Sequence, residues 1–120
     1  MKITTPSIWN EASFIQSLPE LLEFDLHCPK GNNIENLENL PVLNLKKLRL
    51  SRCNKVTDFS PLVLCRHLMT LNLWACNIPD FDWCKHLKKV EDIQLMSVDA
   101  NDFTGLRALT GLKHINLSGS

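Results

Sequence analysis

The stretch Leu68-Met-Thr-Leu71-Asn-Leu73-Trp-Ala-Cys76-Asn-Ile78-Pro-Asp80-Phe81 decides the fold of this 120-residue chain. Its leucines are spaced as L-x-x-L-x-L, and a cysteine, an isoleucine and an Asp-Phe pair follow them. The same pattern recurs through most of the chain. Recurrence with a period of about 20 to 50 residues is typical of solenoids and related arrays, in which each copy stacks on the next. The chain is therefore expected to be an array of stacked copies.

Five copies of the leucine pattern follow one another at intervals of 22 to 24 residues. Each copy predicts a short strand, in which the leucines at the fourth and sixth positions share one face because side chains alternate along a strand. One copy cannot bury these leucines alone, so stability must come from stacking. The predicted repeat domain covers residues 21–120, with strands near 21–26, 45–50, 68–73, 90–95 and 112–117.

The second half of each copy also repeats. After each of three Asp-Phe pairs, apolar residues fall at the third, sixth and ninth positions, a step that suits 3₁₀ turns. The aspartates are expected to hydrogen-bond the backbone of their own turns, an interpretation preferred over a row of carboxylates for a cation. The phenylalanines are expected to stack as a spine. The pairs are Asp58 and Phe59, Asp80 and Phe81, and Asp102 and Phe103.

The first twenty residues differ from the rest and are expected to form an N-terminal helical cap, residues 1–20. Ile8, Ala12 and Ile15 fall on one face of a helix predicted over residues 7–17. Pro19 should end this helix, because proline cannot continue one. A solenoid needs such a cap to cover the core of its first repeat; a disordered tail is the alternative.

These copies resemble the leucine-rich repeat family in its short, 22-residue form, over about residues 12–120. Val56-Thr-Asp-Phe-Ser-Pro-Leu62 is similar to the turn of internalin-type and phosphatase-regulator-type repeats, although the later copies carry Asp-Phe-Asp-Trp and Asp-Phe-Thr-Gly. The resemblance implies an α/β fold: a right-handed solenoid with a concave parallel sheet of about five short strands. It also implies an irregular or 3₁₀ convex side and an N-terminal capping helix.

The resemblance further implies a ladder of Asn or Cys residues that hydrogen-bond the loop after each strand. In this chain the ladder is expected at Pro29, Cys53, Cys76, Val98 and Ser120. Cys53 and Cys76 are therefore expected to be structural. The family resemblance also implies a concave surface that binds another protein.

Composition excludes several function classes. The chain has 13 basic and 13 acidic residues, whereas nucleic-acid-binding proteins concentrate positive charge. No apolar run approaches the length of a membrane span, and the stretch from Met1 to Trp9 lacks the apolar segment that is typical of a signal peptide. The five cysteines form no C-x-x-C pair, which favours reduced thiols in a cytoplasmic protein; a secreted effector is the alternative.

No catalytic, metal-binding or cofactor-binding arrangement is recognisable. The four histidines are scattered, and none joins a Cys or Asp at ligand spacing. The serines lack a nucleophile-elbow context, and no glycine-rich phosphate loop is present. We therefore predict that the protein is not an enzyme and needs no cofactor.

The residues between the leucines should point outward from the concave face, where Trp74 and Met96 are expected to be exposed neighbours. Trp and Arg are enriched at interaction hot spots, and Met at adaptable surfaces. Packing of Trp74 over its own neighbours, or a subunit contact, is the alternative. The predicted partner-binding residues are Lys47, Arg49, Asn72, Trp74, Gln94 and Met96.

The sequence therefore predicts a non-catalytic protein-interaction module. Its last residues, Leu117-Ser-Gly-Ser120, lie on or just after the fifth strand, with no capping segment. An uncapped end exposes a sheet edge. The alternatives are a regulatory or effector fragment of a larger array, or a scaffold that forms homo-oligomers through this end.

Overall fold

The computed structural model describes residues 2–4, 21–28, 37 and 44–119, with the backbone alone for residues 2–4. The helix predicted over residues 7–17 lies outside the described residues, as does Pro29. Statements below about features that are absent refer to this part of the chain.

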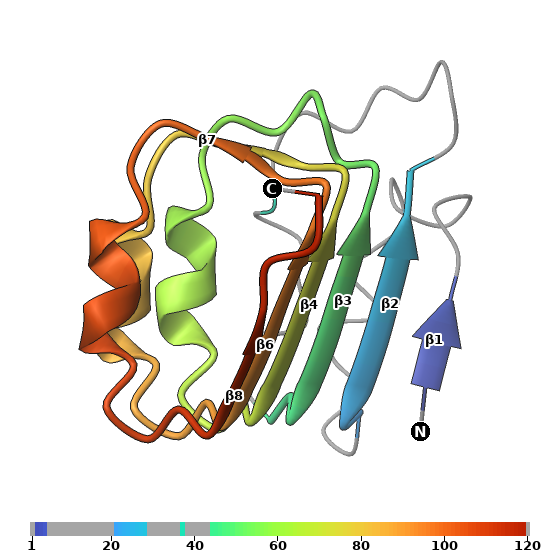
Figure 1. Ribbon diagram of the computed structural model, residues 1–120. Helices are drawn as coiled ribbons and strands as arrows, with labels where there is room; N and C mark the ends of the chain where they lie inside the picture. Colours follow the sequence, from blue (N-terminus) through green and yellow to red (C-terminus); the bar gives the residue numbers. More distant parts are fainter. Residues whose placement is uncertain (1, 5–20, 29–36, 38–43, 120) are drawn as a thin grey trace.

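One parallel sheet forms one wall of the molecule (Figure 1). Each residue of a strand pairs with the residue one repeat later, so that Asp25, Arg49, Asn72, Gln94 and Asn116 stand in one row. The six strands, in their order across the sheet, are β1 (Lys2–Thr4), β2 (Glu23–His27), β3 (Lys47–Ser51), β4 (Thr70–Trp74), β6 (Asp92–Met96) and β8 (His114–Asn116). Strand β1 adds a sixth strand that the leucine pattern did not predict.

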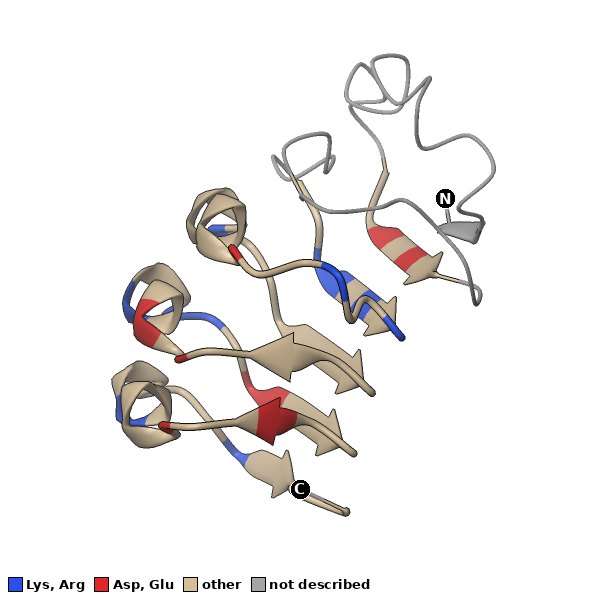
Figure 2. Ribbon diagram, turned by 90° about the horizontal axis from the view of Figure 1, so that it is seen from above, with Lys and Arg blue, Asp and Glu red and all other residues tan. Residues whose placement is uncertain are grey.

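Three 3₁₀ helices form the opposite wall, and Figure 2 shows them stacked in one column beside the strands. They are η2 (Ser60–Leu64), η3 (Asp82–His86) and η4 (Thr104–Ala108). A small second sheet, β5 (Asn77–Ile78) and β7 (Asp99–Ala100), connects successive turns between the two walls. The threefold spacing of apolar residues is explained by these helices, and the predicted 3₁₀ convex side is confirmed.

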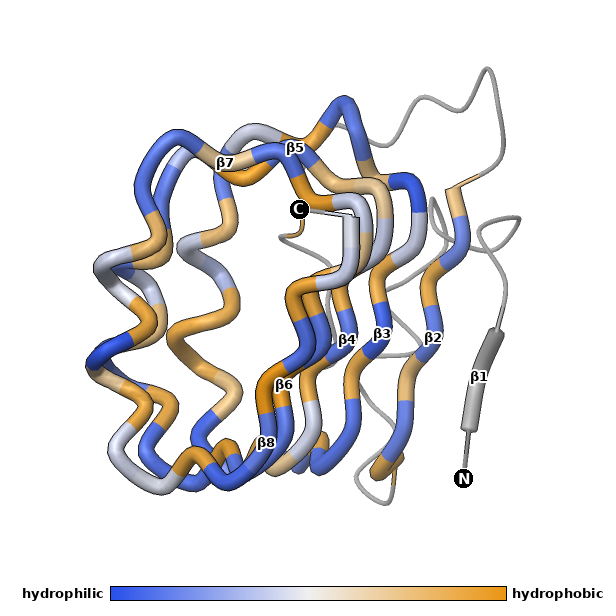
Figure 3. The backbone as a smooth tube through the Cα atoms, viewed as in Figure 1, coloured by the Kyte–Doolittle hydropathy of each residue, from blue (hydrophilic) through white to orange (hydrophobic). Residues whose placement is uncertain are grey.

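The core lies between the two walls and runs without interruption along the stack. Phe24, Leu48, Leu71 and Ile93 are each at most 1% exposed and occupy equivalent places in successive strands. Figure 3 shows the alternation of apolar and polar residues along strands β2, β3, β4 and β6. Burial of such a side chain contributes roughly 1.5–3 kcal/mol, so the stacked rows supply most of the stability.

A left-handed residue follows each of three strands and turns the chain away from the sheet. Arg52, Ala75 and Ser97 have φ of 59°, 53° and 54°, and Gly119 has φ of 71° after β8. The backbone N–H of Arg52 donates to Trp74 O at 2.7 Å, and that of Ala75 donates to Met96 O at 2.9 Å. A left-handed conformation raises the free energy of a residue with a Cβ atom. These bonds offset that cost, because they continue the hydrogen bonding of the sheet into the turn.

Candidate functional site

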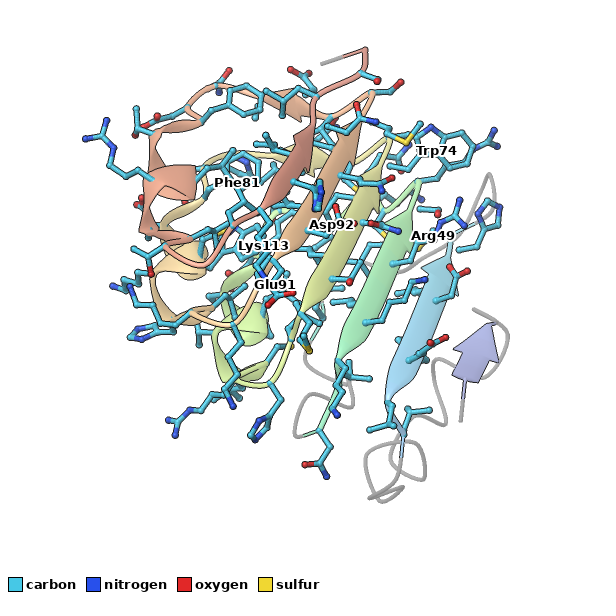
Figure 4. All side chains as sticks on the ribbon, turned by 60° about the horizontal axis from the view of Figure 1, so that its bottom comes forward. Arg49, Trp74, Phe81, Glu91, Asp92 and Lys113 are labelled. Carbon is cyan, nitrogen blue, oxygen red and sulfur yellow. The ribbon has the colours of Figure 1, made fainter. Side chains whose placement is uncertain are left out.

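A pocket of about 360 Å³ lies on the concave face, over strands β3, β4 and β6. The register brings Arg49, Asn72 and Gln94 into one row across these strands, and Trp74 and Met96 into the next row. We call this the concave pocket; its lining residues are Arg49, Asn72, Leu73, Trp74, Gln94 and Met96. Figure 4 shows Arg49 and Trp74 on the same face of the sheet. Five of the six predicted partner-binding residues line this pocket. The sixth, Lys47, is exposed at the start of β3 and lies outside the pocket lining.

The apolar side of the concave pocket is formed by Trp74 and Met96. Met96 is 39% exposed, whereas Trp74 is only partly exposed. The guanidinium carbon of Arg52 lies 5.1 Å from the centroid of the Trp74 ring, a cation–π contact. Arg52 was not among the predicted site residues. No feature of the leucine spacing indicates that residue 52 turns back over the ring, because this depends on its left-handed backbone.

The charged side of the concave pocket is formed by Arg49. Asp25 lies opposite Arg49 in the register, and Glu23 lies opposite Lys47. In neither pair do the charged nitrogen and oxygen atoms come within 4 Å of each other. Among the described residues, the ion pair that meets this limit joins Lys113 Nζ to Glu91 Oε1, 3.4 Å apart. Figure 2 shows how the charged residues are distributed over the sheet: acidic residues lie on β2 and β6, and basic residues lie on β3. Strand β3 therefore presents two cations, Lys47 and Arg49, that are not neutralised by a close partner among the described residues.

Asn72 lies at the centre of the row and carries an unsatisfied acceptor. Its Oδ1 atom is buried and accepts no hydrogen bond within the described residues. A buried polar atom without a partner costs about 1–3 kcal/mol.

The aspartates of the Asp-Phe pairs hold the start of each 3₁₀ helix. Asp58 Oδ1 accepts a hydrogen bond from Ser60 N at 2.9 Å, and Asp80 Oδ1 accepts one from Asp82 N at 3.0 Å. Asp102 Oδ1 accepts two, from the Thr104 N at 2.8 Å and from its hydroxyl at 2.6 Å. The hydrogen bond from Ser60 lowers the pKa of Asp58, and that from Thr104 lowers the pKa of Asp102.

The aromatic rings on the convex side include one residue that the spine prediction omitted. Phe81 and Phe103 stack with their centroids 5.5 Å apart. Trp83 lies 6.0 Å from Phe59 and 5.6 Å from Phe81, and its Nε1 donates to Asp80 O at 3.0 Å. Trp83 therefore contacts the rings of two successive repeats. It also lines a second pocket of about 350 Å³ between η2 and η3.

All five cysteines are free thiols and buried. Cys76 Sγ donates to Trp74 O at 3.4 Å and to Leu50 O at 3.6 Å, and Cys53 Sγ donates to Ser51 O at 3.7 Å. The bonds to Ser51 and Trp74 join the ends of β3 and β4 to the loops that follow them, and the bond to Leu50 joins two successive repeats. In the preceding repeat, Cys28 Sγ lies 3.0 Å from Cys53 Sγ. The alignment of the copies predicts Pro29 at this position of the ladder. Burial raises the pKa of Cys65 and of Cys84 to about 12.

Other kinds of site find no support in the described residues. No three His, Cys, Asp or Glu side chains there are arranged to hold a metal ion. No helix there is long and apolar enough to cross a membrane. The concave pocket itself contains no pair of groups arranged for proton transfer or nucleophilic attack, since its polar members are one guanidinium and two amides.

Comparison with known proteins rests on structure. No family model matches the sequence, and no curated protein matches it either. Among solved structures, internalin C2 from Listeria monocytogenes superposes with a TM-score of 0.68 over 84% of this chain, at 25% sequence identity. This chain has the leucine-rich repeat fold. The parallel sheet, the 3₁₀ convex side and the internalin neighbour agree, so the predicted solenoid is confirmed, apart from its N-terminal cap.

The leucine-rich repeat protein spans 43% of the internalin C2 chain, less than half of its length. The internalin-like repeat fold is typical of protein-interaction modules and is typically non-catalytic. The relationship supports this coarse assignment for the present chain.

Proposed function

We propose that this leucine-rich repeat protein binds a protein partner through its concave face, with the concave pocket at the centre of the contact. The observation that carries the proposal is the composition of this pocket. It places Trp74 and Met96 beside Arg49 and two side-chain amides, in a hollow of about 360 Å³. Trp and Arg are the residue types most often found at interaction hot spots.

The chemistry of the concave pocket favours a segment that carries both an apolar side chain and a carboxylate. The apolar group would cover the Trp74 ring and the Met96 thioether. The carboxylate would pair with the Arg49 guanidinium, whose planar donors suit carboxylate geometry. If the Asn72 side chain rotated outward, a backbone N–H of the same segment would satisfy its Oδ1 atom, which is buried in the free protein. The contact between Arg52 and Trp74 reduces the freedom of the ring before binding, which lowers the entropic cost of association.

The net charge of zero supports a protein partner rather than a nucleic acid. We also propose a cytoplasmic location and a scaffold role, in which binding holds the partner without changing it chemically. The five free, buried thiols support a reducing compartment.

The test is capture of a partner from native lysate by the full chain, followed by affinity measurements with that purified partner. We expect Trp74→Ala and Arg49→Ala each to weaken the affinity by at least tenfold while the circular dichroism spectrum stays unchanged. Leu64→Ala is the matched control, because Leu64 is an apolar residue, 52% exposed, on the convex helix η2. Unchanged affinity in both concave variants would refute the concave-face assignment.

A second candidate role is favoured by the exposure of the β8 repeat. Ile115 is 48% exposed and Leu117 is 47% exposed, although the equivalent residues of β6, Ile93 and Leu95, are buried. A further repeat of a larger regulatory or effector protein, or a second copy of this chain, would cover them. Light scattering tests whether a second copy of the chain covers these residues. A dimeric mass for the wild type and a single-chain mass for Ile115→Glu would support self-association, whereas a single-chain mass for the wild type at high concentration would reject it.

A further inference from the structure

Three thiols lie in one column at the ends of strands β2, β3 and β4. Cys28 Sγ and Cys53 Sγ are 3.0 Å apart, closer than the van der Waals separation of two sulfur atoms. Cys76 follows in the next repeat, and its thiol also interacts with that of Cys53. Cys28 and Cys53 are 25 positions apart in the sequence, so a bond between their sulfur atoms would join two repeats.

The separation of Cys28 and Cys53 does not suit a bound metal ion. A tetrahedral ion with Zn–S bonds of about 2.3 Å holds its sulfur ligands about 3.8 Å apart, and a linear ion holds them further apart. A sulfur–sulfur distance of 3.0 Å is shorter than either. The backbone N–H of Cys28 donates to Ser51 O at 2.9 Å, so the two strand ends that carry these thiols lie side by side, as a disulfide between them requires.

The contact between Cys28 and Cys53 shifts the pKa values of the two thiols in opposite directions, and the hydrogen bond with Cys53 lowers the pKa of Cys76 as well. The hydrogen bond with Cys53 lowers the pKa of Cys28, and the same contact raises the pKa of Cys53. Cys28 therefore bears the thiolate more readily than Cys53. Cys65 and Cys84 have no sulfur neighbour among the interactions described, and burial keeps them protonated at neutral pH.

We infer that Cys28 and Cys53 form a reversible disulfide when the protein meets a peroxide, and that this bond cross-links the first two repeats. The Cys28 thiolate attacks one peroxide oxygen, the O–O bond breaks, and the departing hydroxide takes a proton to become water. The sulfur of Cys53 then attacks the resulting sulfenic sulfur, the S–O bond breaks, and a second water leaves with the Cys53 proton. Two sulfur atoms are oxidised and one peroxide is reduced.

Cys28 and Cys76 compete for Cys53, and the geometry favours Cys28. The thiol of Cys76 already donates to the carbonyl oxygens of Trp74 and Leu50. Disulfide formation with Cys76 would break these bonds and leave two buried carbonyl groups with one donor fewer. Because Cys28 is only 1% exposed, peroxide reaches it through local opening of the strand end. Oxidation should therefore be slow, and low concentrations of denaturant should accelerate it.

A tryptic map of the oxidised full chain distinguishes the two pairings. Cleavage after Lys and Arg separates Cys28 (peptide 3–30), Cys53 (peptide 53–55) and Cys65 (peptide 56–66) from Cys76 and Cys84, which share peptide 67–85. After treatment with hydrogen peroxide and alkylation of free thiols, we expect the 3–30 peptide linked to the 53–55 peptide, about 2 Da lighter than the two reduced peptides. Dithiothreitol should restore both reduced peptides.

The stability of the oxidised protein gives an independent readout. The cross-link restricts the unfolded chain, so peroxide should raise the melting temperature of the wild type by roughly 5 °C or more. Cys28→Ala should abolish this rise, and Cys84→Ala, the matched control at a buried thiol outside the column, should retain it. A link from 53–55 to 67–85, or oxidised wild-type protein in which both thiols remain open to alkylation after unfolding, would overturn the inference.

Discussion

Arg52 covers the face of Trp74 from the left-handed turn that follows strand β3, with its guanidinium carbon 5.1 Å from the ring centroid. Trp74 is the last residue of β4, so this contact joins two successive repeats at the edge of the concave pocket. Cation–π contacts at partly exposed sites are worth about 0.5–1 kcal/mol.

We therefore predict that Arg52 and Trp74 are energetically coupled. A double-mutant cycle with Arg52→Ala and Trp74→Ala, measured by urea unfolding, should give a coupling energy of about 0.5–1 kcal/mol. Arg66→Ala replaces Arg52→Ala in the control cycle, because Arg66 is an exposed arginine that follows η2 on the other side of the molecule. Coupling of equal size in both cycles would mean that the contact contributes nothing specific.

The central repeat should be the most sensitive to loss of core volume. Leu71 is fully buried between β3 and β6, so Leu71→Ala should destabilise the protein by about 2–5 kcal/mol through the cavity it leaves. Ile115 occupies the equivalent place in β8 but is 48% exposed, and Ile115→Ala should cost clearly less. Both values come from urea unfolding. Similar losses at the two positions would contradict the expectation that stability depends on neighbours on both sides.

Gly105 permits the close approach of helices η3 and η4. A Cβ atom at this position would lie 2.5 Å from the backbone carbon and oxygen of Phe81. Because backbone cannot move aside cheaply, Gly105→Ala should destabilise the protein by about 1–3 kcal/mol and shift the helices apart. Gly111→Ala is the milder comparison, since its Cβ would lie 3.1 Å from Lys88 O. Thermal unfolding of the two variants should rank them in this order.

Acid should weaken the turn that Asp102 holds. The hydrogen bond from Thr104 lowers the pKa of Asp102 below its ordinary value of 3.8. A carboxyl group whose pKa is lower in the folded state stabilises the fold above the ordinary value, and this contribution disappears as pH falls through the lowered value. Asp102→Asn should therefore be less stable than the wild type at neutral pH, and the difference should shrink below pH 3.8.

Melting temperatures of the wild type and Asp102→Asn between pH 7 and pH 2 provide the measurement. Asp99→Asn is the control, because Asp99 is exposed on β7 and its carboxylate accepts no hydrogen bond from the described residues. A pH-independent difference between the wild type and Asp102→Asn would show that the charge of Asp102 has no part in holding the turn.

The sheet and its register could be predicted from the sequence because the signal is local and repeated. Leucines such as Leu48 and Leu71 must face inward, and a slip of one residue would reverse every side chain of a strand. The residues between them, among them Arg49 and Asn72, then align by necessity. The concave pocket could therefore be anticipated from the alignment of the copies.

The remaining features depend on backbone conformation or on irregular residues. Nothing about the residue types of Arg52, Ala75 and Ser97 indicates left-handed turns, since none is glycine or asparagine. The contact between Arg52 and Trp74 was missed for this reason. Cys28 adjoins Cys53 although the alignment of the copies favours Pro29, and the pattern of the copies gives no sign of this contact.

The in-register pairing of the strands has a consequence for how such a protein changes during evolution. Partner-contacting residues on neighbouring strands come from positions 22 or 23 apart in the sequence, so duplication of one genetic segment of that length inserts one complete strand. The insertion would move Arg49 and Gln94 apart by about 4.8 Å without disturbing the packing of either. Gain or loss of whole segments can therefore change the width of the binding surface in steps of one strand.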